Sequence, residues 1–169
     1  MERSMKTGVG RTMEQKYWTD TQASSEKDYW ETPQWLFDEL HKEHNFTIDV
    51  AASDDNAKLP TYYTVVDDAL KKIWEGRVFC NPPYGREVKK WVKKAYEESL
   101  QPYNEKVVMI IPSRTDTTYW HDYIFNKAHI KFLKGRLKFE LGGDAGQPAP
   151  FPSAVVIFDK TTGGKQWNN

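Results

Sequence analysis

The stretch Val78-Phe79-Cys80-Asn81-Pro82-Pro83-Tyr84 decides how the chain can be interpreted. Its first three residues are apolar and predict a buried strand, which the two prolines after Asn81 must end. Each proline fixes its own φ, lacks an N–H donor and keeps the preceding residue extended. The segment after the strand is therefore predicted to be stiff, with carbonyl groups free to accept hydrogen bonds.

The groups around the prolines can act together on one substrate. The Asn81 amide oxygen and the Pro82 carbonyl can each accept one N–H of a planar substrate that carries an NH2 group. The Tyr84 ring can stack on the face of the same substrate, and Pro83 keeps the segment rigid. This geometry would aim the nitrogen lone pair at an electrophile, which is catalysis by positioning and hydrogen bonding. The plainer alternative is a strand that ends in a proline-stiffened turn.

Helix and strand patterns alternate along the rest of the chain. Helices are predicted at 32–44, 67–74, 86–99 and 117–127, and strands at 46–52, 62–66, 77–81, 106–111, 130–140 and 153–159. This order predicts an α/β fold, a three-layer sandwich whose sheet is mostly parallel with an antiparallel C-terminal edge strand.

The first predicted helix has a clear start signal. Thr32 is expected to cap it and Pro33 to occupy its first position. The helix is expected to bury four apolar side chains, those of Trp35, Leu36, Phe37 and Leu40.

Composition divides the chain into one domain and two flanking segments. Residues 1–28 are polar without a periodic apolar pattern and are predicted to form a flexible arm. Residues 29–160 are expected to form a single domain, and residues 161–169 a C-terminal tail.

Charge and cysteine content exclude several classes of protein. The 24 basic and 24 acidic side chains rule out a polycation that binds nucleic acid through bulk charge. One cysteine excludes a disulfide framework, and no apolar run reaches the ~20 residues of a membrane span. A soluble, cytoplasmic protein without membrane contact is expected. We also predict no metal, because His41 and His44 lack an evident third ligand.

Polar residues follow the predicted strands at the edge where ligands bind in such sheets. Asp49, Asp68 and Asn81 all fall at or just past strand ends. Asp49 lies in an apolar run and needs a partner, either an ammonium group or ribose hydroxyls of a cofactor, or an internal salt bridge or helix cap. Ala51 is small enough for a ligand to approach the backbone.

Basic residues near the motif are candidates for phosphate contact. A lysine cluster that includes Lys89 lies on the helix after the motif. It is also consistent with a solvated face, supported by pairs of Lys93 with Glu97 and Lys94 with Glu98. Arg114 is the better candidate for DNA contact, because a guanidinium binds phosphate or guanine through two hydrogen bonds.

Taken in order, the motifs resemble one known family. They are Trp30-Glu-Thr-Pro33, Leu36-Phe37, Phe46-Thr-Ile-Asp49-Val-Ala-Ala52, Asn56-Ala-Lys58, Tyr62-Tyr63, Asp68-Ala-Leu70, Asn81-Pro-Pro-Tyr84, Ile111-Pro-Ser-Arg-Thr-Asp-Thr117, Gly135-Arg-Leu137 and Pro150-Phe-Pro-Ser153. From about Trp30 to Phe158 the chain resembles the small phage-type DNA adenine methyltransferases, which methylate the exocyclic amine of adenine.

The resemblance implies a Rossmann-like methyltransferase fold, S-adenosylmethionine as cofactor and double-stranded DNA as partner. The cofactor would contact seven residues: Trp30, Thr32, Pro33, Asp49, Ala51, Asp68 and Asn81. Asn81 and the Pro82 carbonyl would accept from the amine of an adenine flipped out of the helix. DNA would contact five residues: Tyr84, Arg86, Lys89, Arg114 and Thr115.

The chain departs from larger relatives because it has no room for a separate target-recognition domain. Sequence readout would then come from loops at 85–90, 113–121 and 141–152 or from the N-terminal arm. The sequence makes no prediction for the recognition sequence or the oligomeric state.

Two alternatives remain at this point. The same tetrapeptide serves enzymes that methylate a protein glutamine or an RNA guanine, which also present a planar NH2. A catalytically inactive DNA-binding module is the other alternative, although such a protein would have no need of Asn81.

Overall fold

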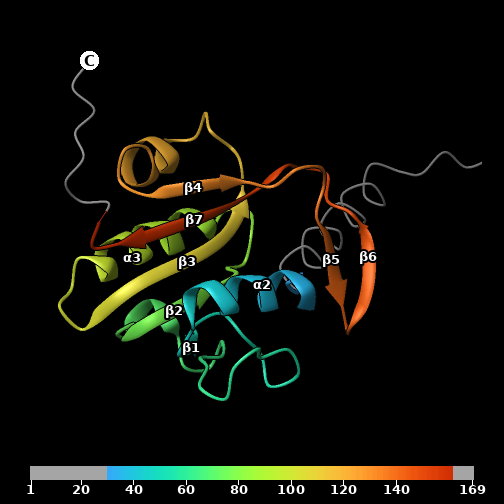
Figure 1. The fold of residues 1–169 in the computed structure, drawn as a ribbon, viewed down its shortest axis with the longest axis horizontal. Helices are drawn as coiled ribbons and strands as arrows, with labels where there is room; N and C mark the ends of the chain where they lie inside the picture. Colours follow the sequence, from blue (N-terminus) through green and yellow to red (C-terminus); the bar gives the residue numbers. More distant parts are fainter. Residues whose placement is uncertain (1–29, 162–169) are drawn as a thin grey trace, which may run out of the picture.

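A computed structural model of the protein describes residues 30–161 (Figure 1). The predicted arm at 1–28 and most of the predicted tail lie outside these residues. In chain order the elements are α2 (Gln34–His44), β1 (Ile48–Asp49), the 3₁₀ turn η1 (Ala69–Lys71), β2 (Gly76–Cys80), α3 (Val88–Ser99), β3 (Asn104–Pro112), the π-helical turn η2 (Trp120–Ile124), β4 (His129–Phe132), β5 (Lys138–Leu141), β6 (Asp144–Pro148) and β7 (Ser153–Asp159).

The main sheet has five strands in the order β1-β2-β3-β7-β4. β1, β2 and β3 pair in parallel, and β7 runs antiparallel to both of its neighbours. The register places Asp49 beside Phe79 and Cys80 beside Met109. The ends of β1 and β2 therefore lie together, which brings the polar residues after them to one edge of the sheet.

The two long helices cover opposite faces of this sheet (Figure 1). On the α2 face, Phe37 meets Phe79 of β2 with ring centroids 5.1 Å apart. On the α3 face, Tyr96 meets Phe158 of β7 at 6.1 Å. Between the helices, residues 107–111 of β3 have no exposed surface. An α/β fold with a mixed sheet is thus confirmed, and the finer Rossmann-like, three-layer assignment stays a prediction.

The predicted antiparallel strand occupies a different place from the one expected. β7 lies between β3 and β4 rather than at the edge. Its residues 153–156 are all buried, whereas β4 is short and mostly exposed and carries Lys131. An edge strand tolerates short length and charge, whereas an interior strand needs apolar residues on both faces. This difference explains why β4 lies at the edge and β7 in the interior.

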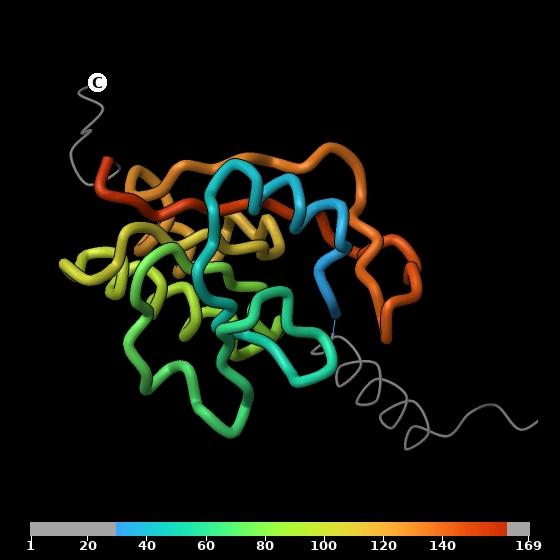
Figure 2. The backbone as a smooth tube through the Cα atoms, turned by 60° about the horizontal axis from the view of Figure 1, so that its bottom comes forward, coloured from blue at the N-terminus to red at the C-terminus, as the bar shows by residue number. Residues whose placement is uncertain are grey.

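A two-stranded hairpin, β5–β6, lies beside the main sheet (Figures 1 and 2). The prediction of a single strand at 130–140 is wrong, because the segment divides between β4 and β5. Gly135 adopts φ +74° and separates β4 of the main sheet from β5 of the hairpin. The loop predicted at 141–152 contains β6, so much of it belongs to the hairpin.

Four other predicted elements are shorter than expected. The strand expected at 46–52 is reduced to two residues, and that at 62–66 to a bridge between Tyr62 and Asp49. The Asp67 carboxylate accepts from the Thr64 N–H at 2.8 Å and turns the chain there. The helices expected at 67–74 and 117–127 are the short turns η1 and η2. In each of these two helices, local turn formation competes with the longer helix.

The start of α2 also differs from the prediction. Pro33 is the N-cap residue, and no side chain caps the helix. The expected cap, Thr32, is buried and its hydroxyl has no hydrogen-bond partner. Leu36, Phe37 and Leu40 are buried as expected, but Trp35 is 60% exposed.

No described helix is long and apolar enough to cross a membrane. The predicted cytoplasmic location stays a prediction.

We expect Gly76→Ala to destabilise the protein more than Gly135→Ala. Both glycines have φ near +75°, which costs an L-residue about 1–2 kcal/mol. A Cβ at Gly76 would also lie 2.6 Å from Thr47 Oγ1, whereas a Cβ at Gly135 would meet nothing within 4 Å. The clash should add about 1–3 kcal/mol to the loss in free energy of unfolding, measured by urea denaturation. Equal losses in the two variants would contradict this account.

Candidate functional site

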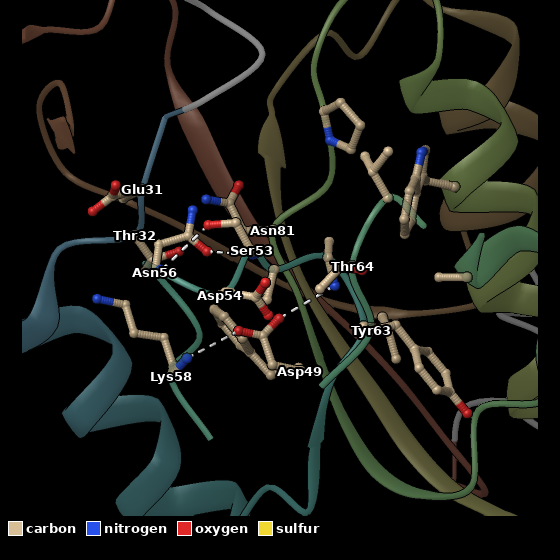
Figure 3. A pocket seen from close by; sticks show the side chains of 18 of the residues that line it. Glu31, Thr32, Asp49, Ser53, Asp54, Asn56, Lys58, Tyr63, Thr64 and Asn81 are labelled. Carbon is tan, nitrogen blue, oxygen red and sulfur yellow. Dashed lines mark hydrogen bonds between the residues drawn. The ribbon is translucent and has the colours of Figure 1, made fainter. Parts of the chain in front are cut away.

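A cavity of about 530 Å³ opens where β1 and β2 end (Figure 3). Its walls come from the segments that follow β1 and β2, from Trp30, Glu31 and Thr32, and from the beginning of α3. The volume is in the range of ordinary small-molecule sites. The edge that the sequence analysis predicted for a ligand is therefore hollow.

The predicted site residues divide into two groups. Seven of them line the cavity: Trp30, Thr32, Asp49, Ala51, Asp68, Asn81 and Pro83. The remaining seven do not line it: Pro33, Pro82, Tyr84, Arg86, Lys89, Arg114 and Thr115. Most of the residues expected around the cofactor thus meet at one place, and the residues expected to contact DNA lie outside it.

Asp49 is a buried carboxylate that forms no ion pair with a described residue, although the charge of nearby Lys58 favours its ionised form. Its side chain accepts hydrogen bonds from the backbone N–H groups of Ala51 and Lys58, each at 3.3 Å. The Lys58 ammonium instead bonds to Gln34 Oε1 at 3.0 Å. Burial raises the pKa of Asp49 to about 6, and the two backbone hydrogen bonds only partly oppose this effect. The carboxylate is therefore available to a cationic or hydroxyl-bearing ligand.

Thr32 is a second polar group that lacks a protein partner. Its side chain lines the cavity, is 2% exposed and makes no hydrogen bond. A buried hydroxyl without a partner costs about 1–3 kcal/mol, and a polar ligand group would remove that cost. Thr32 also lies immediately before the first turn of α2, where backbone N–H groups favour an anion.

Sequence reasoning missed several cavity residues. Asn56 and Lys58 were named only within a family motif, and the exposed Val65 and Val66 were predicted to belong to a strand; none of the four was predicted as a site residue. All four line the cavity. Asn56 fixes its own loop, because its side-chain oxygen accepts from the Ser53 N–H at 2.7 Å. The Ser53 hydroxyl in turn accepts from the Asn56 N–H at 3.3 Å, and this reciprocal pair, which resembles a capping box, could have been predicted from the Ser-Asp-Asp-Asn order.

Asn81 is held from both ends of its side-chain amide. Its Nδ2 donates to the Trp30 carbonyl at 2.9 Å, and its Oδ1 accepts from the Tyr84 hydroxyl at 2.8 Å. The same hydroxyl lies 3.0 Å from the Ile110 carbonyl. The amide is thus oriented before any ligand arrives.

The position of Tyr84 differs from the expectation that it stacks on a substrate. Its side chain is 6% exposed and packs edge-on against Trp30, Phe139 and Phe151. Burial raises the pKa of Tyr84 well above its usual range, so the hydroxyl stays protonated and can donate. In this conformation Tyr84 can orient Asn81, and stacking on a base would require the ring to leave this aromatic group.

Cys80, the possible metal ligands and the lysines of α3 have simple structural explanations. Cys80 is fully buried in β2 and burial raises the pKa of its thiol, as expected for a structural cysteine. Within residues 30–161 there is no cluster of three or more metal-ligating side chains. Lys93 pairs with Glu97 on a solvated face, as expected, whereas the pair of Lys94 with Glu98 is largely buried and Glu98 also accepts from the Trp74 N–H.

Arg114 is exposed and lies after the end of β3. Its guanidinium lies over the Phe151 ring at 5.9 Å from the centroid. Its backbone N–H is bonded to the Pro112 carbonyl at 2.9 Å. The charge is therefore placed beside the aromatic group that surrounds Tyr84.

Comparison with known proteins identifies the family. The family described as "DNA N-6-adenine-methyltransferase (Dam)" matches residues 19–166. The chain belongs to this Dam family. A DNA N-6-adenine-methyltransferase of Haemophilus phage HP1 is 29% identical over 143 residues, which cover 80% of each chain. Another, of Escherichia phage T1, is 28% identical over 121 residues, which cover 70% of this chain and 50% of the phage protein.

Membership in the Dam family confirms the resemblance stated above. The chain is an adenine-specific DNA methyltransferase, and DNA is its substrate. The alternatives of glutamine or RNA methylation and of an inactive binding module are not favoured by these relatives. The matched region includes the cavity, Asn81 and the β5–β6 hairpin.

We expect Asp49 to make stability depend on pH in the absence of ligands. The folded protein holds this proton up to about pH 6, and the unfolded chain releases it near pH 3.8. Between these values the folded state binds more protons, so the free energy of unfolding falls as pH rises. This component, about 3 kcal/mol, should be absent in Asp49→Asn and present in Asp55→Asn. Urea denaturation from pH 4 to 7 tests it, and a pH-independent difference between Asp49→Asn and the wild type would contradict it.

Proposed function

We propose that the cavity binds S-adenosylmethionine, and that Asn81 and the Pro82 carbonyl hold the amino group of a flipped adenine beside it. When bound, the cofactor supplies an electrophilic methyl group. The observation that carries the proposal is the fixed Asn81 amide at the cavity wall, bonded to Trp30 at 2.9 Å and to Tyr84 at 2.8 Å. The bond to Trp30 orients this acceptor before the substrate arrives and can persist when Tyr84 moves to stack on the base, which limits the reorganisation required.

The polar groups of the cavity fit the cofactor's charged and hydroxyl groups. The Asp49 carboxylate lacks a cationic partner and would pair with the cofactor's ammonium or its ribose hydroxyls. The Thr32 hydroxyl, without a protein partner, would bond to the carboxylate of the amino-acid part. Ala51 leaves room for close approach, and Asp68 supplies a further acceptor at the rim. Both buried groups would then be satisfied only in the complex.

The amine is held by acceptors of this chain. Asn81 Oδ1 takes one N–H and the Pro82 carbonyl takes the other; the amide oxygen has two lone pairs, so it can accept this bond beside the one from Tyr84. Extrusion of the base costs a few kcal/mol of stacking. The Tyr84 ring would stack on the base after leaving its contacts with Trp30 and Phe151.

Contacts to DNA are proposed for exposed basic and polar residues near this edge. They are Arg86, Lys89, Arg114 and Thr115. Arg114 has the clearest geometry, because its guanidinium lies over Phe151 beside the Tyr84 ring. Phosphate contacts of this kind position the duplex and make binding dependent on salt.

We expect Asn81→Ala to lower methyl transfer by about 10²–10³-fold while cofactor affinity changes little. The variant removes the amide oxygen that accepts from the substrate amine. Tritium transfer from labelled cofactor to unmethylated duplex DNA measures the rate, with RNA and a glutamine-bearing protein offered in parallel. Calorimetry measures cofactor affinity.

Two results would count against the role of Asn81. One is full activity of Asn81→Ala on DNA. The other is a loss of cofactor affinity that matches the loss of activity. Gln101→Ala, an exposed change at the end of α3, serves as the control for handling and folding.

We expect Arg114→Ala to weaken DNA binding and to reduce its dependence on salt. Loss of one phosphate contact should lower the slope of log K against log salt by about 1. Lys42→Ala, an exposed change near the end of α2 remote from the cavity, should leave the slope unchanged. Fluorescence anisotropy with a labelled duplex, measured from about 50 to about 300 mM salt, gives both slopes. Over this range of salt each phosphate contact changes the DNA affinity by about 10-fold or less. Identical slopes in Arg114→Ala and Lys42→Ala would remove Arg114 from the interface.

A further inference from the structure

The Asn81 amide depends on a main-chain carbonyl far away in the sequence. Nδ2 donates to the carbonyl of Trp30 and Oδ1 accepts from the Tyr84 hydroxyl. If the amide were flipped, its oxygen would face the Trp30 carbonyl, and two acceptors would repel each other. The Tyr84 hydroxyl does not enforce this choice, because it can donate or accept. The Trp30 carbonyl therefore decides which end of the amide is presented as the acceptor.

Trp30 is held in place by the β5–β6 hairpin. Its neighbour Glu31 forms an antiparallel bridge with Glu140 of β5, with N–H···O distances of 3.0 and 2.9 Å. The Trp30 ring stacks on Phe139 of β5, with centroids 5.1 Å apart and an angle of 25° between the planes. One strand of the hairpin thus fixes both the backbone and the ring of the segment that orients Asn81.

The hairpin packs against the rest of the protein through one face. Phe139 is 3% exposed and points inward, whereas Lys138, Leu141, Asp144 and Gln147 are exposed. Gly146 of β6 lies so close to β5 that a Cβ there would be 2.7 Å from the Phe139 carbonyl. The two strands are therefore closely paired, and the contacts of β5 with Glu31 and Trp30 connect the hairpin to Asn81.

We propose that the β5–β6 hairpin is a positioning element of the methylation reaction, which acts through the Glu140–Glu31 bridge and the Trp30 carbonyl on the Asn81 amide. The inference rests on the proposed role of Asn81 as acceptor of the adenine amine. Neither Phe139 nor Glu140 lines the cavity, and neither was predicted to belong to the site. Their effect on the reaction passes through the bridge rather than through contact with the cofactor.

A matched pair at Glu140 isolates the backbone contact. Glu140→Pro removes the N–H that bonds to the Glu31 carbonyl, and Glu140→Ala keeps it. Both variants lose the same carboxylate and its contact with the Gln34 N–H. We expect single-turnover methylation to fall about 10–100-fold in Glu140→Pro and by less than about 3-fold in Glu140→Ala, since misplacing a positioned group has effects of this size. Because Trp30 and Glu31 also line the cavity, the rates are measured at saturating DNA and cofactor, so that a change in binding does not enter the comparison.

Nuclear magnetic resonance supplies a readout that does not depend on turnover. The side-chain ¹⁵N–¹H₂ signal of Asn81 is assigned by its absence in Asn81→Ala. It should be protected from solvent exchange in the wild type and in Glu140→Ala, and it should lose that protection in Glu140→Pro. If Glu140→Pro fails to fold, Phe139→Leu takes its place, because it weakens the stacking that also holds Trp30. The same losses of methylation and of Asn81 protection are then expected, and their absence overturns the inference.

Three outcomes overturn the inference: unchanged methylation in Glu140→Pro, unchanged protection of the Asn81 signal, or equal loss of activity in both Glu140 variants. The proposed role of Asn81 fails separately. Full activity of Asn81→Ala rejects that role whatever the hairpin does, whereas an inactive Asn81→Ala beside a fully active Glu140→Pro rejects only the hairpin's part.

Discussion

The hydrogen bonds at the end of β2 constrain everything around them. β2 enters the sheet between β1 and β3, and Pro82 and Pro83 prevent it from continuing. Asn81 must therefore leave the sheet at the edge where β1 also ends. The bond from its amide to Trp30, at 2.9 Å, then ties the beginning of the described chain to its centre. The cavity wall, the aromatic group around Tyr84 and the segment that carries the hairpin all meet at this bond.

The cavity keeps two polar groups incompletely satisfied. Asp49 is a buried carboxylate whose pKa burial raises to about 6, and Thr32 is a buried hydroxyl with no partner. Both reduce the stability of the free protein, because a buried polar group loses its contacts with water. A ligand that supplies the missing partners recovers this free energy as affinity. Binding sites of enzymes typically contain residues of this kind, which lower the stability of the free protein.

Local chemistry predicted the site better than it predicted the lengths of the elements. The prolines after Asn81 and the acid in the apolar run at Asp49 placed both residues correctly at the edge of the sheet. The strand expected at 130–140 failed because Gly135 turns the chain out of the sheet. Trp35 was expected in the core, yet it is 60% exposed, because the buried residues of α2 (Leu36, Phe37, Leu40 and His44) form one face of the helix and Trp35 lies on the opposite face. Contacts between distant segments, such as Trp30 with Phe139, leave no pattern in one sequence.

The burial of Cys80 has a practical consequence. It is the single cysteine of the chain, has no exposed surface, and burial raises the pKa of its thiol well above the usual range. Alkylating reagents attack accessible thiolates, and this thiol is neither accessible nor ionised. A cysteine introduced on the outer side of the hairpin would therefore take up a fluorophore or spin label alone, in the native protein, with Cys80 left in place. Distances between such a label and a marked duplex could then be followed while the enzyme works.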